Sequence, residues 1–296
     1  MVDTTTHLGK LKLQNPIVTA SGTFGNGIEF ADFLNLDKLG AITLKSITLE
    51  PKTGNLPPRI LETPSGMLNS IGLENKGLNN LIENILPQLE PLKKVKIIGN
   101  IAGHSVDENI DLAKVLEKQK KIEALEVNIS CPNVDAGGLA FCNDLVVVEK
   151  MIKEIRQVYT KPLIVKLSVS VSDYLGLAET AIKSGADILT AINTVLGLEV
   201  DLKNKRLYFQ RGYAGLSGPA IRPIALKAVY DLAQSFDIPI IGAGGVATIE
   251  DVIKFIIVGA NAVSIGMMNF VEPDLAEKLA DEYTEYVKKN GMIQRI

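Results

Sequence analysis

Residues Pro239–Val246 read PIIGAGGV, and Ala262–Met267, a short distance further on, read AVSIGM. Each segment is a short apolar run that contains or ends near glycine. Thr248–Val258, between them, has the apolar spacing of an amphipathic helix. A strand, a crossover helix and a second strand make up one unit of a parallel sheet. Near-continuous apolar runs are typical of strands that are buried on both faces, as in such a sheet.

Six further segments of the same kind precede this pair, most of them bounded by Gly, Pro, Asn or Ser. They are Pro16–Ser21, Ala41–Ile47, Val95–Ala102, Ala124–Ser130, Pro162–Ser168 and Ile188–Asn193. Amphipathic stretches with helical spacing are found at Ser105–Lys120, Leu145–Tyr159, Tyr174–Ser184, Pro223–Phe236 and Pro273–Lys289. Eight strand–helix units in series predict a closed (β/α)8 TIM barrel rather than an open sheet. No linker or low-complexity tract divides the chain, so residues 1–296 are expected to form a single domain.

Two intervals are too long for a simple strand-to-helix connection. Thr48–Gly77, after the second strand, is rich in proline and glycine. Val195–Gly218, after the sixth strand, contains LEVDLKNKRLYF, which predicts a hairpin around Lys203-Asn204-Lys205. Loops that follow strands lie on the catalytic face of such barrels, so we expect both long insertions on that face.

The composition limits the environment and the partners of the chain. Of its 296 residues, 46% are hydrophobic and 22% charged, which is typical of a globular protein with a large core. A net charge of −3 gives no general attraction to nucleic acid or anionic membranes. No apolar run approaches the roughly 18 residues of a membrane helix, and the start, MVDTTTHLGK, does not resemble a signal peptide. We therefore expect a cytoplasmic protein without nucleic-acid or membrane partners.

Polar side chains and glycines occur at the carboxyl ends of the predicted strands, where barrels carry their active sites. Lys45 and Lys166 interrupt apolar runs, and a buried ammonium is costly unless an anion or an electron-rich ligand meets it. Gly244-Gly245 and Gly266 allow close approach to the backbone after strands seven and eight, a frequent phosphate site. Taken singly, each residue is equally compatible with a strand-end cap. Together, a phosphate site and a central lysine favour bound flavin mononucleotide (FMN).

The segment EVNISCPN, residues 126–133, leads out of the fourth predicted strand. Cys131 is a candidate general base or nucleophile, because the asparagines beside it suit a polar heterocycle. The alternative is a small buried hydrophobic side chain, which is the usual state of a free cysteine. Cys142 has no such neighbours and is expected to be structural, and His104 opens a helix and is expected to be peripheral. Two cysteines exclude a disulfide framework and a four-cysteine metal or cluster site within this chain.

Several motifs together carry a family resemblance. They are NPIVTASGTFGNG, KSITLEP, GNLPPR, GMLNSIGLENKG, EVNISCPNV, INTVLG, GLSGPAIRPIAL and IGAGGV. In this order the chain resembles the class 1 dihydroorotate dehydrogenases along essentially its full length, and the 1B branch most closely. That family is built on a flavin-binding barrel. The resemblance implies an FMN-dependent oxidoreductase that converts dihydroorotate to orotate in pyrimidine (UMP) biosynthesis.

The resemblance also implies roles for particular residues. Cys131 would take the proton from C5 of dihydroorotate while hydride passes from C6 to flavin N5. The implied pocket for the pyrimidine and its carboxylate is Lys45, Asn69, Ser70, Ile71, Gly72, Leu73, Asn128, Asn133, Asn193 and Thr194. The implied FMN contacts are Ser21, Lys45, Ser46, Asn100, Asn128, Lys166, Ile192, Gly218, Gly244, Gly245, Gly266 and Met267. The chain departs from the family at Met267, where Ser or Thr is usual, and at Tyr213-Ala214, where a glycine pair is expected.

The electron acceptor remains open at this point. The 1B branch passes electrons to a second subunit with FAD and a [2Fe–2S] cluster, and finally to NAD, whereas the 1A branch uses fumarate directly. Resemblance to 1B implies a homodimer that binds this iron–sulfur flavoprotein as a heterotetramer. Two rival interpretations are a tRNA dihydrouridine synthase, which should have a basic surface, and a non-catalytic flavin- or phosphate-binding module, which should lack an intact catalytic loop.

Overall fold

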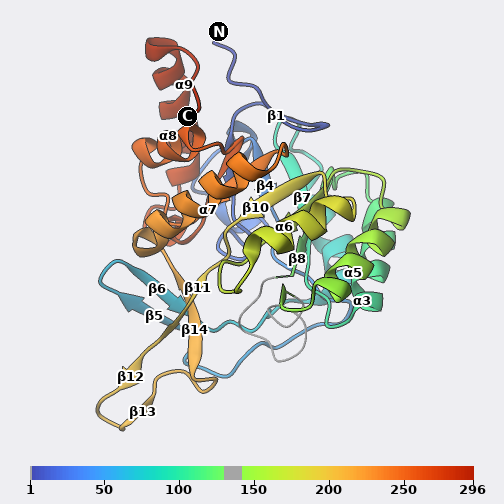
Figure 1. Ribbon diagram of the computed structural model, residues 1–296, viewed down its shortest axis with the longest axis vertical. Helices are drawn as coiled ribbons and strands as arrows, with labels where there is room; N and C mark the ends of the chain where they lie inside the picture. Colours follow the sequence, from blue (N-terminus) through green and yellow to red (C-terminus); the bar gives the residue numbers. More distant parts are fainter. Residues whose placement is uncertain (1, 130–141) are drawn as a thin grey trace.

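Eight short parallel strands close into a barrel in the computed structural model, which describes residues 2–129 and 142–296. Their order around the barrel is β10-β15-β16-β3-β4-β7-β8-β9. The strands are β3 Ile17–Thr19, β4 Ala41–Thr43, β7 Lys96–Ile101, β8 Ala124–Asn128, β9 Leu163–Lys166, β10 Ile188–Ala191, β15 Ile240–Ala243 and β16 Ala262–Ile265 (Figure 1). All eight predicted segments contain a barrel strand, so the predicted (β/α)8 fold is confirmed.

Helices surround the barrel at the positions that the amphipathic stretches predict. They are α3 Val106–Glu117, α5 Leu145–Val158, α6 Tyr174–Lys183, α7 Arg222–Ser235, α8 Ile249–Ile257 and α9 Leu275–Asn290. Side chains of Ser105, Asp144 and Asp173 accept backbone N–H bonds at the starts of α3, α5 and α6, which fixes where these helices begin. Among the described helices, none combines the length and apolar character that a membrane crossing requires.

Two connections depart from the regular pattern. After β3 the chain forms only the short 3₁₀ helices η1, Ile28–Phe30, and η2, Leu36–Lys38. Before β7 it forms a continuous helical stretch of α1, η3 and α2, which span residues 77–80, 81–85 and 86–89.

An N-terminal hairpin that the sequence did not predict closes one end of the barrel. It pairs β1, Thr6–Leu8, with β2, Leu11–Leu13, and lies at the upper end of the molecule in Figure 1. Leu8, Leu11 and Leu13 form one buried cluster with a residue from every barrel strand: Val18, Ala41, Ile98, Ala124, Ile164, Ile188, Ile241 and Ala262. This apolar layer fills the amino-terminal end of the barrel, so polar chemistry is confined to the carboxyl end.

The two long insertions combine into one additional sheet. β5 Ile60–Thr63 and β6 Gly66–Asn69 come from the first, and β11 Val195–Leu198 and β14 Tyr213–Ser217 from the second. The sheet has the order β11-β14-β6-β5, with antiparallel pairs. It extends from the carboxyl end of the barrel, toward the lower end of Figure 1.

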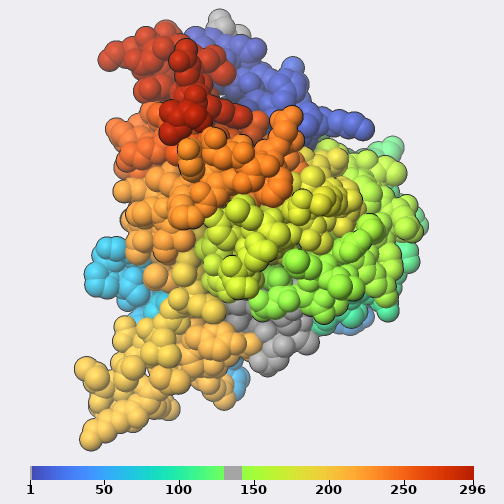
Figure 2. Space-filling model, in the orientation of Figure 1, coloured from blue at the N-terminus to red at the C-terminus, as the bar shows by residue number. Residues whose placement is uncertain are grey.

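The predicted hairpin forms the tip of the second insertion. β12, Val200–Asp201, pairs with β13, Arg206–Leu207, on either side of Lys203-Asn204-Lys205. Figure 2 shows this tip as an arm that projects from the body of the molecule. At the departure Tyr213-Ala214, Ala214 is fully buried in a small cluster with Leu68 and Phe209. The structure therefore gives this position a packing role in the insertion sheet.

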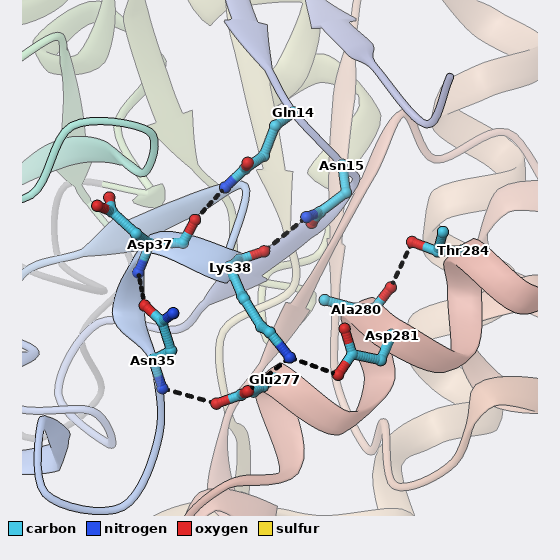
Figure 3. A network of polar contacts seen from close by, with 9 residues as sticks. All are labelled: Gln14, Asn15, Asn35, Asp37, Lys38, Glu277, Ala280, Asp281 and Thr284. Carbon is cyan, nitrogen blue, oxygen red and sulfur yellow. Dashed lines mark hydrogen bonds and ion pairs between the residues drawn. The ribbon is translucent and has the colours of Figure 1, made fainter. Parts of the chain in front are cut away.

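A polar network ties the last helix to the first connection (Figure 3). Lys38 Nζ lies 2.8 Å from both Glu277 Oε1 and Asp281 Oδ2 on α9, and these carboxylates raise the pKa of Lys38. Asp37 accepts N–H bonds from Lys93, Lys94 and Val95 just before β7. Burial opposes ionisation of Asp37, but the backbone hydrogen bonds outweigh it and lower the pKa of this carboxyl. The network therefore holds the closing helix and the entry to β7 against η2.

Candidate active site

A cavity of about 420 Å³ opens at the carboxyl ends of the barrel strands, bounded on one side by the insertion sheet. Its volume lies within the range of small-molecule and cofactor sites. Most residues that the sequence singled out line it: Ser21, Lys45, Ser46, Asn69, Ile71, Gly72, Leu73, Asn128, Lys166, Ile192, Asn193, Thr194, Gly218, Gly244, Gly245, Gly266 and Met267. The structure brings these residues together from seven of the eight barrel strands and from both insertions, while their roles remain predictions.

Strand periodicity explains this convergence. Successive side chains of a strand point to opposite faces, so residues two apart share the barrel interior. Two residues beyond the apolar layer, the interior side chains are polar on six of the eight strands: Thr43, Asn100, Glu126, Lys166, Thr190 and Ser264. Two residues further still, the same register leads to Lys45, Asn128, Ile192, Gly245 and Gly266, which line the cavity. The site is therefore the open end of a barrel that is apolar below and polar above.

Four predicted residues are not among the described residues that line the cavity. Cys131 and Asn133 lie outside the described residues. Ser70 is buried and its hydroxyl accepts from Asn55 Nδ2 at 3.0 Å. Asn100 is 1% exposed and lies below the cavity; its Nδ2 donates to Glu126, and its Oδ1 has no partner among the described residues. The predicted ligand contacts of these four residues stay predictions.

Glycines shape one end of the cavity. Gly218, Gly244 and Gly245 have φ of 97°, 131° and 75°, a region that favours glycine. A Cβ on Gly245 would lie 2.7 Å from Arg222 Cβ and 2.8 Å from the Gly218 carbonyl oxygen. Met267 packs against the same turn, since a Cβ on Gly218 would come within 2.4 Å of its Cε. Backbone that lines the cavity in these turns is suited to an anion such as phosphate.

An ion pair joins the two loops that carry these glycines. Arg222, at the start of α7, places Nη1 2.7 Å from Asp251 Oδ1 in the first turn of α8. Asp251 is 1% exposed, and its Oδ2 also accepts from the Ala247 N–H. The loop after β14 is thus fixed against the loop after β15.

The opposite end of the cavity carries an ion pair and several amides. Lys45 Nζ lies 3.2 Å from Glu74 Oε2, and both side chains line the cavity. Asn193 Nδ2 lies 3.4 Å from Asn128 Oδ1, and Asn128 Nδ2 lies 3.3 Å from Ser46 Oγ. Amide groups both donate and accept, which suits a planar ring with alternating N–H and C=O groups. A lysine beside them suits a carboxylate.

The cavity also contains residues that the sequence reasoning missed. Glu74 and Ser264 line it, and Glu126 lies directly below it. Glu126 had a readable signal: in ALEVN it is a charged residue inside an apolar strand, two positions before Asn128 and hence on the same face. Glu74 had no comparable signal, because its position depends on how the insertion folds back over the barrel.

The described cysteine has the properties of a structural residue. Cys142 is 3% exposed and its thiol donates to the Ile129 carbonyl at 3.0 Å. Burial raises the pKa of this thiol to about 12, although a backbone hydrogen bond opposes the shift. A thiol with this pKa is not a nucleophile at neutral pH. His104 is exposed and its Nε2 lies 3.3 Å from Lys52 Nζ, away from the cavity lining.

Comparisons with known proteins place this site in a family. The family model described as dihydroorotate dehydrogenase matches residues 4–287. The dihydroorotate dehydrogenase B (NAD(+)) catalytic subunit of Carboxydothermus hydrogenoformans is 45% identical over 285 residues, 96% of this chain and 92% of that protein. The protein of the same name from Halalkalibacterium halodurans is 45% identical over 286 residues, 97% and 93% of the two chains.

A solved structure shows the same fold at lower sequence identity. Dihydroorotate dehydrogenase from Eimeria tenella, in complex with ferulenol, superposes with a TM-score of 0.79 at 21% identity, covering 99% of this chain and 86% of that one. The matches to the family model and to the relatives at 45% identity cover nearly the whole chain. The chain belongs to the dihydroorotate dehydrogenase family.

Proposed function

We propose that this chain is the catalytic subunit of an NAD-linked dihydroorotate dehydrogenase, oxidising dihydroorotate to orotate with FMN in pyrimidine biosynthesis. The observation that carries the proposal is the cavity itself: it has a cradle of glycines at one end and a lysine with several amides at the other. The names of relatives at 45% identity support the same assignment.

The residues present fit FMN. Gly218 and the Gly244-Gly245 pair, in two neighbouring loops, have positive φ angles and give a backbone surface that suits the phosphate, with Gly266 just after the next strand. Lys166 lines the cavity near the barrel axis, where a cation stabilises a reduced, anionic flavin. Below it, Asn100 Oδ1, which has no hydrogen-bond partner among residues 2–129 and 142–296, gives the floor an acceptor. We infer that the isoalloxazine lies over this polar floor and the phosphate at the glycine end.

Different residues of the chain bind the substrate and take the proton in the proposed reaction. Lys45 binds the substrate carboxylate, and Asn69, Asn128 and Asn193 hydrogen-bond the pyrimidine ring. Cys131, as thiolate, takes the proton from C5, so that the C5–C6 double bond forms as the hydride leaves C6. Bound FMN supplies the acceptor for that hydride. A thiol of ordinary pKa, about 8.5, is mostly protonated at neutral pH, so this role requires surroundings that favour the thiolate.

We propose that the chain forms a homodimer and that each copy binds one electron-transfer subunit carrying FAD and a [2Fe–2S] cluster. The relatives are named catalytic subunits, which supports a partner that completes the enzyme. An electron relay has to lie close to the flavin, so the docking surface should border the cavity. Ile60 and Phe270 line the cavity and are each 56% exposed, which gives its rim the apolar character of an interface core.

The proposed function is tested on the purified full-length chain. We expect a yellow protein with one FMN per chain that is bleached by dihydroorotate under anaerobic conditions, with stoichiometric orotate formed. Acid extraction that releases FAD, or a reconstituted protein that holds no flavin, would contradict the cofactor assignment. FMN that dihydroorotate fails to reduce would contradict the substrate assignment and leave a non-catalytic flavin-binding module.

A further inference from the structure

A buried carboxylate lies at the floor of the cavity and has no part in the reaction proposed above. Glu126 is 3% exposed, although acidic side chains are almost never fully buried unless they are paired. Both of its carboxylate oxygens accept hydrogen bonds. Asn100 Nδ2 donates to Oε1 at 2.6 Å, and the Thr190 hydroxyl donates to Oε2 at 2.7 Å. The two hydrogen bonds hold the carboxylate group from both sides.

The ion-pair partner of Glu126 is Lys166, on the neighbouring strand β9. Lys166 Nζ lies 4.0 Å from Glu126 Oε1, close enough for attraction but too far for a hydrogen bond. Among the described residues, Ser21 Oγ accepts from this ammonium at 3.3 Å. An ammonium has three donor hydrogens, so Lys166 retains donors for a ligand in the cavity that it lines.

The carboxylate of Glu126 lies inside the barrel between its two hydrogen-bond donors, Asn100 and Thr190. Its two hydrogen-bond donors stand on β7 and β10, on either side of β8 and β9. The side chain of Glu126 is therefore fixed at both oxygens, and the negative charge has one defined place below Lys166. A charge fixed in this way can set where a long, flexible lysine side chain comes to rest.

We propose that Glu126 is a positioning residue that holds Lys166 under the isoalloxazine of FMN and offsets part of its positive charge. The inference rests on the proposed function, because it assigns Lys166 to the flavin. A cation near the flavin favours the anionic reduced form and raises the midpoint potential, whereas an anion beside that cation lowers it again. Glu126 thus makes the reduced flavin a stronger electron donor. This property suits an enzyme whose electrons finally reach NAD, a weak oxidant.

The test removes the charge and keeps the shape. In Glu126→Gln, the midpoint potential of bound FMN, measured against a reference dye, should rise. The affinity for reduced relative to oxidised FMN should increase about tenfold. Thr190→Val is the matched control: it removes a hydrogen bond to the same carboxylate without changing charge, and should leave this affinity ratio within about twofold. A Glu126→Gln protein with the wild-type potential would overturn the proposal.

A second variant covers the case in which Glu126→Gln does not fold, since that change leaves a buried ammonium without its counter-charge. Glu126→Asp keeps the charge but draws it back from Lys166 by one methylene, so the midpoint potential of its bound FMN should also rise above that of the unaltered chain. An unchanged potential in Glu126→Asp would equally overturn the role of Glu126. FMN content and reduction by dihydroorotate are measured on the unaltered chain in parallel. Failure there would reject the proposed function, whereas unchanged potentials would reject only the inference about Glu126.

Discussion

At the scale of single residues, Lys45 already has an anionic partner before any ligand enters. Its bond to Glu74 lies in the wall of the cavity, with the two side chains 28% and 42% exposed. A substrate carboxylate has to draw the ammonium away from Glu74 and approach a second negative charge. Partly exposed ion pairs of this kind contribute little, in the range of about 0.2–1 kcal/mol.

We therefore expect Glu74→Gln to bind orotate about two- to fivefold more tightly than the unaltered chain. The amide still fits the position but no longer competes for Lys45 or repels the ligand. Isothermal titration at low and high salt measures the effect, and the gain should shrink as salt screens the charges. Asp111→Asn is the control, because Asp111 forms an exposed pair with Lys114 on α3. Weaker orotate binding in Glu74→Gln would mean that Glu74 helps to hold the ligand.

Replacing Cys131 should slow flavin reduction far more than replacing Cys142. Cys131→Ala should retain FMN and orotate but reduce flavin about 10²–10⁴ times more slowly, the usual contribution of a positioned base. Cys142→Ala should be nearly silent, since burial raises the pKa of its thiol to about 12 and its hydrogen bonds are to the backbone. Stopped-flow reduction by dihydroorotate compares both variants. Wild-type reduction in Cys131→Ala would reject the assignment.

Residues on the barrel strands were readable from strand periodicity, whereas insertion residues such as Asn69 and Gly72 were predicted only through the family resemblance. Lys45, Asn128 and Lys166 follow strand periodicity, so their convergence depends only on a closed barrel. The partner of Lys45, in contrast, is 29 positions away on a folded-back loop. Long-range placement of this kind has no local sequence signal.

At the scale of elements, the same contrast holds. The eight barrel strands were predicted because each is a self-contained apolar run, and the hairpin of β12 and β13 because its turn is local. The four-stranded insertion sheet was missed because β6 pairs with β14, about 150 residues later, and neither segment has an extended apolar alternation. The hairpin of β1 and β2 was missed because its strands have only three residues each.

The turn between β15 and α8 should tolerate no side chain. Gly245→Ala should weaken FMN binding at least about tenfold and lower the melting temperature, because its Cβ would overlap Arg222 and the Gly218 carbonyl. Gly291→Ala is a matched control: its φ is 79°, but a Cβ there meets no atom within 4 Å. It therefore reports the cost of the backbone conformation alone. Fluorescence of released FMN follows binding, and equal losses in the two variants would argue against a crowded turn.

The contact between η2 and the entry to β7 should depend on pH. The pKa of Asp37 is lowered in the folded chain, so its stabilising effect is present above the ordinary value of 3.8 and is lost as the pH falls through the lower folded value. Asp37→Asn should reduce the free energy of unfolding by about 1 kcal/mol at neutral pH. Urea titrations across the acid range should show this difference disappearing below 3.8. A constant difference at all pH values would refute the role of the charge.

At the scale of the whole molecule, the proposed function gives this chain the transfer of electrons from dihydroorotate to FMN, and gives the partner subunit their transfer to NAD. Expressed alone, it should reduce artificial dyes with dihydroorotate and reduce NAD negligibly. GAGGV lacks the G-x-G-x-x-G spacing of a dinucleotide fingerprint, so the sequence offers no nicotinamide site of that kind. The assay compares NAD, fumarate and a dye as acceptors for the isolated chain. Rapid turnover with fumarate would assign the chain to the 1A branch, and rapid turnover with NAD would remove the need for a partner.

The apolar layer at the amino-terminal end of the barrel affects how substrate and product reach the site. Because Leu8, Leu11 and Leu13 fill the amino-terminal end of the barrel, the described residues leave the opening at the carboxyl ends of the strands as the route for both dihydroorotate and orotate. A small diffusible oxidant that uses this opening can reach the flavin only after the product has left. Substrate and oxidant then bind alternately, which gives ping-pong kinetics. A protein partner docked beside the cavity does not have to wait for product release, because electrons can pass from the flavin through the protein matrix without the partner entering the cavity.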